Sequence, residues 1–263
     1  MKVAAVQLGI YPGDPDKAVA RAELQVRAAS EGEAQLICLP EHWLQARVLT
    51  SGDTIIKRFA RLAKELGVYL NLGANYEKRG EGTWIASHTI SPAGDVISRQ
   101  DKLHLYREET RKAMPGTGFH TFDVAGTKVG VLVCHDIVFP EAARTVTLMG
   151  AELLVVPSMI TASGSGPWLA YLRARCLENR LQIVSPNVYH PPRFLGRSRI
   201  LDLRYELREH VMQLDERKAS HGRTALVAEL DLRSITHLRK ERLRELLGSD
   251  TIRSLYSASK ATS

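Results

Sequence analysis

The sequence predicts an α/β fold, because short apolar segments alternate along the chain with longer segments of helical periodicity. The 263 residues, 44% of them hydrophobic, suffice to bury a substantial core within one large domain. No internal repeat and no long linker rich in Pro, Gly or Ser divides the chain. We therefore expect residues 1–263 to form a single domain.

The predicted strands are apolar runs bounded by turn residues, and the predicted helices carry Ala, Val, Leu or Ile at helical spacing. The strands are expected at Val3 to Leu8, Leu36 to Leu39, Tyr69 to Asn75, Ile85 to Ser91, Val129 to Cys134, Leu153 to Pro157, Gln182 to Asn187 and Thr224 to Asp231. The helices are expected at Asp16 to Glu31, Ile55 to Leu66, Glu141 to Met149 and Pro167 to Arg180.

A further amphipathic helix is predicted over residues 232–247, near the end of the chain. Leucine or isoleucine recurs there near helical spacing among Arg, Lys and Glu. We expect this helix to dock on its own domain or to lie at a subunit interface, rather than to bind a membrane or nucleic acid.

Charge and hydropathy restrict the partners and the location. The net charge is +7, but Arg and Lys are interleaved with Glu and Asp, which favours a solvated basic surface and predicts no nucleic-acid partner. No apolar run approaches the roughly 20 residues of a membrane-spanning helix, so no membrane association is expected. The first residues do not resemble a secretory signal, which predicts a cytoplasmic protein.

The three cysteines are an odd set without CxxC spacing, so we expect reduced thiols. We also predict no cofactor. Cys38 and Cys176 fall in an apolar strand and a helical pattern, as inert buried cysteines do. Cys134 instead ends a predicted strand just before a turn into a helix. Turns of this kind present nucleophiles, because the side chain clears the sheet and nearby backbone N–H groups can bind an oxyanion.

A thiol with a pKa near its usual value of about 8.5 needs a base. His135 follows Cys134, but neighbours along an extended chain point to opposite faces, which disfavours a dyad. His135 and Asp136 also lack spaced partners, so no metal is predicted. Glu41 and Lys102 follow two further strand-like segments, although each alone reads as a surface charge.

Together these segments resemble three motifs of the nitrilase, or carbon-nitrogen hydrolase, superfamily, in the same order. The motif segments are Leu39-Pro40-Glu41, Asp101-Lys102-Leu103-His104-Leu105 and Cys134-His135-Asp136-Ile137-Val138-Phe139-Pro140-Glu141. The resemblance covers nearly the whole chain and implies a four-layer α-β-β-α sandwich that forms a homodimer or higher homo-oligomer. A second glutamate of the family best matches Glu109, ahead of Pro115-Gly116, and Glu108 is its nearest competitor.

The resemblance implies cysteine-dependent hydrolysis of a carbon-nitrogen bond in a small amide through a thioester. Cys134 would be the nucleophile, Glu41 the general base, and Lys102 the group that stabilises the thiolate and the oxyanion. Glu109 would orient Lys102 or the leaving nitrogen. We expect His135 and Met159 to contact the substrate.

Departures from the family pattern bear on the substrate. His135-Asp136 stands where nitrilases that act on nitriles typically have Trp-Glu, which favours amides. Ile137 and Val138 occupy positions where hydrolases of N-carbamoyl amino acids often place an arginine, so a carboxylate clamp is missing there. An N-carbamoyl amino acid hydrolase and a nitrilase stay open as alternatives, and a non-catalytic binding or assembly module is the alternative of another class.

Overall fold

Two β-sheets form the centre of the computed structural model, which describes residues 1–45, 47–246, 248 and 251. The first sheet has the order β15-β1-β2-β4-β5-β6, with β3 beside β4. Its strands are β1 (Lys2–Gln7), β2 (Leu36–Cys38), β3 (Leu49–Thr50), β4 (Tyr69–Arg79), β5 (Gly82–Ile90), β6 (Val96–Asp101) and β15 (Thr224–Glu229).

The second sheet has the order β14-β13-β10-β9-β8-β7. Its strands are β7 (Thr121–Val124), β8 (Thr127–Val131), β9 (Leu153–Val155), β10 (Gln182–Ser185), β13 (Arg199–Glu206) and β14 (Val211–Lys218). A short separate hairpin pairs β11 (Tyr189–His190) with β12 (Phe194–Leu195). In each large sheet parallel central strands are flanked by antiparallel outer strands.

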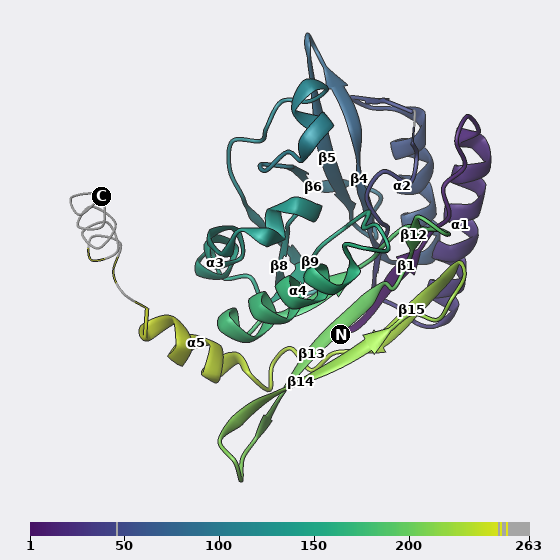
Figure 1. Ribbon diagram of the computed structural model, residues 1–263. Coiled ribbons are helices and arrows are strands. Elements are labelled where there is room, and N and C mark those ends of the chain that lie inside the picture. The colour runs from purple at the N-terminus through teal and green to yellow at the C-terminus, as the bar shows by residue number, and fades with distance from the viewer. Residues whose placement is uncertain (46, 247, 249–250, 252–263) are drawn as a thin grey trace.

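The two sheets pack face to face through one apolar cluster, in which Val3 and Ile85 of the first sheet meet Val131 and Ile200 of the second. Helices α1 (Pro15–Glu31) and α2 (Thr54–Leu66) cover the outer face of the first sheet. Helices α3 (Pro140–Leu148) and α4 (Ser165–Asn179) cover the outer face of the second (Figure 1). The predicted α/β class and the four-layer α-β-β-α sandwich are thus confirmed.

The first two helices begin at side-chain caps. The Asp14 carboxylate accepts a hydrogen bond from the Lys17 N–H, and the Asp53 carboxylate accepts one from the Ile55 N–H. These bonds satisfy backbone donors that have no partner within the helix. Helix α2 ends at Gly67, whose φ of 66° is the left-handed conformation that glycine adopts without a Cβ penalty.

The last helix differs from its prediction. Helix α5 spans Thr236–Arg244, whereas residues 232–247 were predicted, and Leu247 lies outside the described residues. The helix begins late because the Asp231 carboxylate accepts hydrogen bonds from the N–H groups of Arg233 and Ser234, which form a turn instead.

The start of α5 packs against the chain's own second sheet and helix layer. Leu238 is buried in the apolar cluster beneath α3 and α4. The Arg239 guanidinium donates hydrogen bonds to the backbone carbonyls of Arg180 and Glu152. A role of this segment at a subunit interface stays a prediction. Within the described part of the chain, no helix combines the length and apolar character that a membrane crossing requires.

Candidate active site

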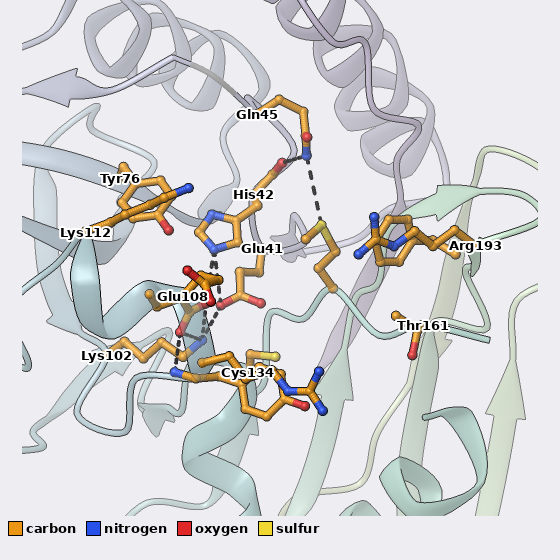
Figure 2. Close-up of a pocket in the computed structure, with 15 residues that line it drawn as sticks. Glu41, His42, Gln45, Tyr76, Lys102, Glu108, Lys112, Cys134, Thr161 and Arg193 are labelled. Atoms are coloured by element: carbon orange, nitrogen blue, oxygen red, sulfur yellow. Dashed lines mark hydrogen bonds and ion pairs between the residues drawn. The ribbon is translucent and has the colours of Figure 1, made fainter. Parts of the chain in front are cut away.

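Three strand ends converge in the space between the two sheets. Glu41 follows β2 and Lys102 follows β6, both in the first sheet, while Cys134 follows β8 in the second. Their relative exposures are only 2%, 1% and 9%. Figure 2 shows the three side chains directed toward one another at the floor of a cavity. The structure therefore brings together residues that lie far apart in the sequence.

A glycine in β4 allows the Glu41 segment to come close. The pairing of β4 with β5 is irregular between Asn71 and Ala74, and Gly73 there has a φ of 67°. A Cβ at Gly73 would collide with the Pro40 carbonyl oxygen. The Leu39 N–H donates to the Asn71 carbonyl at 2.9 Å and the His42 N–H to the Ala74 carbonyl at 2.7 Å, so the chain is fixed on both sides of Glu41.

We expect Gly73→Ala to destabilise the protein and to lower its turnover. The new methyl group adds both a steric clash and left-handed strain, together worth roughly 2–4 kcal/mol in the free energy of unfolding. Any shift of Pro40 would displace Glu41 from the cluster. Gly80→Ala is the matched control, since Gly80 has a φ of 54° but an added Cβ would have no neighbour within 4 Å. Equal losses of stability in urea unfolding of the two variants would contradict this account.

Lys102 bridges two carboxylates. Its Nζ lies 2.8 Å from Glu41 Oε1 and 2.8 Å from Glu109 Oε2. Glu109 is held in turn by the Tyr106 N–H at 2.7 Å and lies 3.3 Å from His42 Nε2. These contacts satisfy an ammonium that would otherwise be costly to bury.

The structure also separates the two glutamates that the sequence left in competition. Both lie on the short 3-10 helix η1 (Arg107–Arg111). Glu109 points to Lys102, whereas Glu108 is exposed and pairs with Arg111 at 3.0 Å. Of the two, Glu109 is the residue that lies in the buried cluster.

The cluster is charged. Burial lowers the pKa of Lys102, but the charges of Glu41, of a Cys134 thiolate and of Glu109 outweigh burial and raise that pKa overall. Burial raises the pKa of Glu109, but its hydrogen bond with His42 and the charge of Lys102 lower it to about 2. Lys102 therefore remains an ammonium ion and Glu109 a carboxylate near neutral pH.

The low pKa of Glu109 predicts a pH-dependent contribution to stability. Because the folded-state pKa of about 2 lies below the ordinary value of 4.5, the contribution is fully present above pH 4.5 and is lost as the pH falls toward 2. It amounts to roughly 3 kcal/mol at most. Glu109→Gln should thus differ from wild type in urea unfolding at pH 7, and the difference should shrink in acid. A difference independent of pH would contradict this, and Glu108→Gln serves as the exposed control.

Cys134 occupies a strained turn. Strand β8 ends at Val131, before the predicted end at Cys134, and the 3-10 helix η2 (Cys134–Val138) leads directly toward α3. Cys134 has a φ of 45°, in the left-handed region, and its N–H donates to the Pro157 carbonyl at 3.0 Å. Such strain at a strand-to-helix turn is typical of presented nucleophiles.

The Cys134 thiol is neutral at rest. Burial raises its pKa, and the charge of Glu41 raises it further, while Lys102 and the backbone N–H of Met159 act in the opposite direction. The net shift is well above the ordinary value. Glu41 and Cys134 line the same cavity, so the carboxylate lies on the side from which it could accept the thiol proton.

Asp136 joins the lysine and cysteine segments. It is fully buried, and its carboxylate accepts hydrogen bonds from the N–H groups of His104 at 2.8 Å and Val133 at 3.0 Å. Asp136 therefore sets the distance between two site segments rather than lining the cavity. This role was not predicted from the sequence; the only signal for it was that His104 and Asp136 both stand within the motif segments.

The cavity above the cluster has a volume of about 420 Å³ and adjoins a second lobe of about 630 Å³. Met159 lines both lobes, and His135 lines the second beside Cys134. Sequence reasoning missed His42, which stacks on Tyr76 with ring centroids 4.9 Å apart. Its position directly after Glu41 was the only signal.

One group of side chains has the composition of a metal site within the described ranges. Single ligand atoms of Glu41, His42 and Glu109 all lie within 4.8 Å of one another. The Lys102 ammonium, however, contacts both carboxylates and already supplies the positive charge between them. The group fits an ion-pair network, because a cation there would be repelled by Lys102.

A four-layer sandwich with a buried carboxylate, ammonium and thiol has the parts of a cysteine hydrolase. Residues 2–240 match the profile of the carbon-nitrogen hydrolases. The chain belongs to the carbon-nitrogen hydrolase family.

Similar proteins span almost the whole chain. A protein named nitrilase from Pyrococcus abyssi is 30% identical, and the alignment covers 94% of this chain and 95% of that protein. The omega-amidase NIT2-A of Xenopus laevis is 27% identical, with coverage of 91% and 92%.

Solved structures share the fold. Nit3 of Saccharomyces cerevisiae, a member of the nitrilase superfamily, superposes with a TM-score of 0.80 at 22% identity, covering 95% of this chain and 96% of that one. An amidase from Nesterenkonia sp. superposes with a TM-score of 0.75 at 24% identity, covering 94% and 96%.

Proposed function

We propose that the protein is an amidase that hydrolyses a non-peptide amide bond of a small molecule, with Cys134 as nucleophile. The observation that carries the proposal is the Lys102 ammonium, held at 2.8 Å from both Glu41 and Glu109 beside a thiol on a strained turn. A carboxylate base, an electrostatic stabiliser and a nucleophile are thereby combined in one largely buried site.

In the first half-reaction, Glu41 takes the Cys134 proton as the sulfur attacks the amide carbonyl carbon. Negative charge then develops on the carbonyl oxygen, where the Lys102 ammonium stabilises it. The carbon-nitrogen bond breaks as Glu41 returns the proton to the nitrogen, which leaves as ammonia or an amine. An acyl thioester on Cys134 remains.

In the second half-reaction, Glu41 removes a proton from a water molecule that attacks the thioester carbonyl. The carbon-sulfur bond breaks, the carboxylic acid is released, and the sulfur regains its proton. Glu109 acts by positioning Lys102 through both half-reactions. The raised pKa of Cys134 supports this order, because a neutral thiol must lose its proton during the attack.

Several relatives support amide hydrolysis, since they are named omega-amidases. Hydrolysis of nitriles is the second candidate, because a relative at 30% identity is named nitrilase. An N-carbamoyl amino acid hydrolase and a non-catalytic binding or assembly module are the further alternatives. The buried ion-pair cluster argues against a mere binding module, since a charged group is rarely kept in the interior without a task.

Ammonia or amine release from a panel of small amides, N-carbamoyl amino acids and nitriles tests the proposal. We expect amides to be the fastest class, with acylation of Cys134 detectable by mass spectrometry of the quenched enzyme. Release from nitriles alone would shift the assignment to nitrilase. Absence of release from every class, together with an unmodified thiol, would favour the binding module.

The proposal extends to the organisation of the chain: a single carbon-nitrogen hydrolase domain that assembles into a homodimer or a higher homo-oligomer. Light scattering of the purified protein measures the assembly. A cytoplasmic location stays a prediction; all three cysteines are free thiols in the structure, as a reducing compartment would keep them.

A further inference from the structure

A second pocket lies on the outer face of the first sheet, between the first half of α2 and strands β4, β5 and β6. Its volume is about 310 Å³, and its lining residues differ from those of both lobes of the cavity at Cys134. Gly94 holds the turn between β5 and β6 close to α2, since an added Cβ would lie 3.1 Å from the Ala60 carbonyl oxygen. The pocket is therefore built from packed elements, and its size suits a small molecule.

The most buried polar residues of this pocket are Glu77 and His88, with relative exposures of 1% and 4%. Glu77 Oε1 lies 3.5 Å from His88 Nε2, and Glu77 Oε2 lies 3.5 Å from Arg79 Nε. Both distances exceed those of ordinary hydrogen bonds. Within the described part of the chain, Glu77 Oε2 has no hydrogen-bond partner. An N–H donor from a ligand would satisfy this buried carboxylate, which is costly to leave without donors.

The neighbouring Arg79 is committed elsewhere. Its guanidinium donates to Asp101 Oδ1 at 2.7 Å and lies over the Trp84 ring at 4.1 Å. Burial raises the pKa of Glu77, but the nearby His88, Arg79 and Arg99 lower it overall. Glu77 is therefore a carboxylate near neutral pH, and it gives the floor of the pocket a negative charge.

Two exposed cations, Lys57 and Arg99, line the same pocket. Among the residues that the structure describes, neither side chain forms an ion pair or a hydrogen bond. The lining also includes the apolar side chains of Ile56, Ala60 and Val96, which suit methylene groups. Lys57 and Arg99 would repel a lone metal cation, and Glu77 would repel a lone anion. A ligand that carries both charges matches this arrangement.

We infer that the pocket binds a small zwitterion of the ω-amino acid class, whose ammonium donates to Glu77 and whose carboxylate is held by Lys57 and Arg99. An α-amino acid carries both charges on one carbon, whereas here the carboxylate of the pocket is buried and its cations are exposed. Methylene groups between the charges allow both contacts. The inference is independent of the proposed function, because no residue of the Cys134 cavity takes part.

Isothermal titration calorimetry of the full chain tests the inference with γ-aminobutyrate and δ-aminovalerate. Butylamine and butyrate each keep one charge of the first probe, and pentylamine and valerate each keep one charge of the second. We expect Kd of the better zwitterion to be at least about tenfold lower than that of either single-charge counterpart. Because Lys57 and Arg99 are exposed, Kd should rise with ionic strength.

Variants assign the binding to residues. Glu77→Gln should raise Kd of the zwitterion by about tenfold or more, and the double variant Lys57→Gln, Arg99→Gln should raise it to the value for the matched amine. Arg61→Gln, which removes an exposed charge of α2 outside the pocket, should leave Kd unchanged. Circular dichroism monitors the fold. The two exposed cations keep the inference testable if the buried Glu77→Gln variant does not fold.

Three results would overturn the inference. Equal binding of γ-aminobutyrate and butylamine, with the same result for the longer pair, would remove the contact between the ligand carboxylate and the two cations. Undiminished binding in the double variant and in folded Glu77→Gln would place the ligand outside this pocket. Absence of binding heat from both zwitterions at high concentration would show that the pocket takes neither. Each result would leave the amidase proposal intact, because amide release that depends on Cys134 is measured separately.

Discussion

Replacement of Cys134 by alanine should abolish amide turnover while leaving the protein folded. We expect kcat to fall by on the order of 10⁴-fold or more, since no other thiol reaches the cavity and the thioester cannot form. Cys134 packs in the apolar cluster between the sheets, but the substitution removes only a single sulfur atom, so the free energy of unfolding should change by only about 1 kcal/mol. Ammonia release and urea unfolding measure the two effects.

Cys176→Ala is the matched control. Cys176 is also fully buried, but it lies in α4 on the face that packs against the second sheet, and it lines neither lobe of the cavity. Its loss should create a small void that costs about 1 kcal/mol of stability, with turnover largely retained. Turnover in Cys134→Ala close to that of wild type would remove Cys134 from the mechanism.

Replacement of Glu41 by glutamine should remove the general base and leave the nucleophile Cys134 in place. The amide has the shape of the carboxylate but cannot accept the thiol proton, so kcat should fall by about 10²–10⁴-fold. The negative charge of Glu41 raises the pKa of Cys134. Its removal should lower that pKa, and alkylation of Cys134 by iodoacetamide near neutral pH should become faster.

The prediction is specific because amide hydrolysis should become slower while alkylation of Cys134 becomes faster. A merely structural role for Glu41 would slow amide hydrolysis and alter alkylation only through unfolding, which circular dichroism detects. Full amidase activity in Glu41→Gln would exclude Glu41 as the base. Glu108→Gln, on the exposed side of η1, serves as the control for loss of a nearby carboxylate.

The interior strands could be predicted from the sequence because burial on both faces makes them continuously apolar. Val3 to Val6 of β1 and the three residues of β2 are all fully buried. The missed strands of four or more residues lie at or next to sheet edges: β6 and β7 end their sheets, and β14 ends the second beside β13. The others, β3, β11 and β12, have only two residues each, too few to show a period. Edge strands such as β14 expose one face, and charged residues there conceal the period.

The catalytic candidates could be predicted because Glu41, Lys102 and Cys134 stand in local motifs. Their neighbours could not, since each gains its place through a distant segment. His42 depends on Tyr76 of β4, and Asp136 depends on the backbone at His104. Arg107 and Arg193, which lie far apart in the chain, likewise line one cavity only in the folded protein. Sequence motifs therefore locate the reacting groups, whereas the positions of the surrounding side chains depend on how distant segments pack.

Because the site residues come from both sheets, the protein can lose its catalytic arrangement without unfolding either sheet. Glu41 and Lys102 are carried by one sheet and Cys134 by the other, and the cluster of Val3, Val131 and neighbouring side chains holds the sheets together. A state in which each sheet kept its helices but the interface loosened would retain its secondary structure and part the thiol from its base. Loss of amide turnover would therefore report loosening of the interface between the sheets. It would precede the loss of secondary structure that circular dichroism detects.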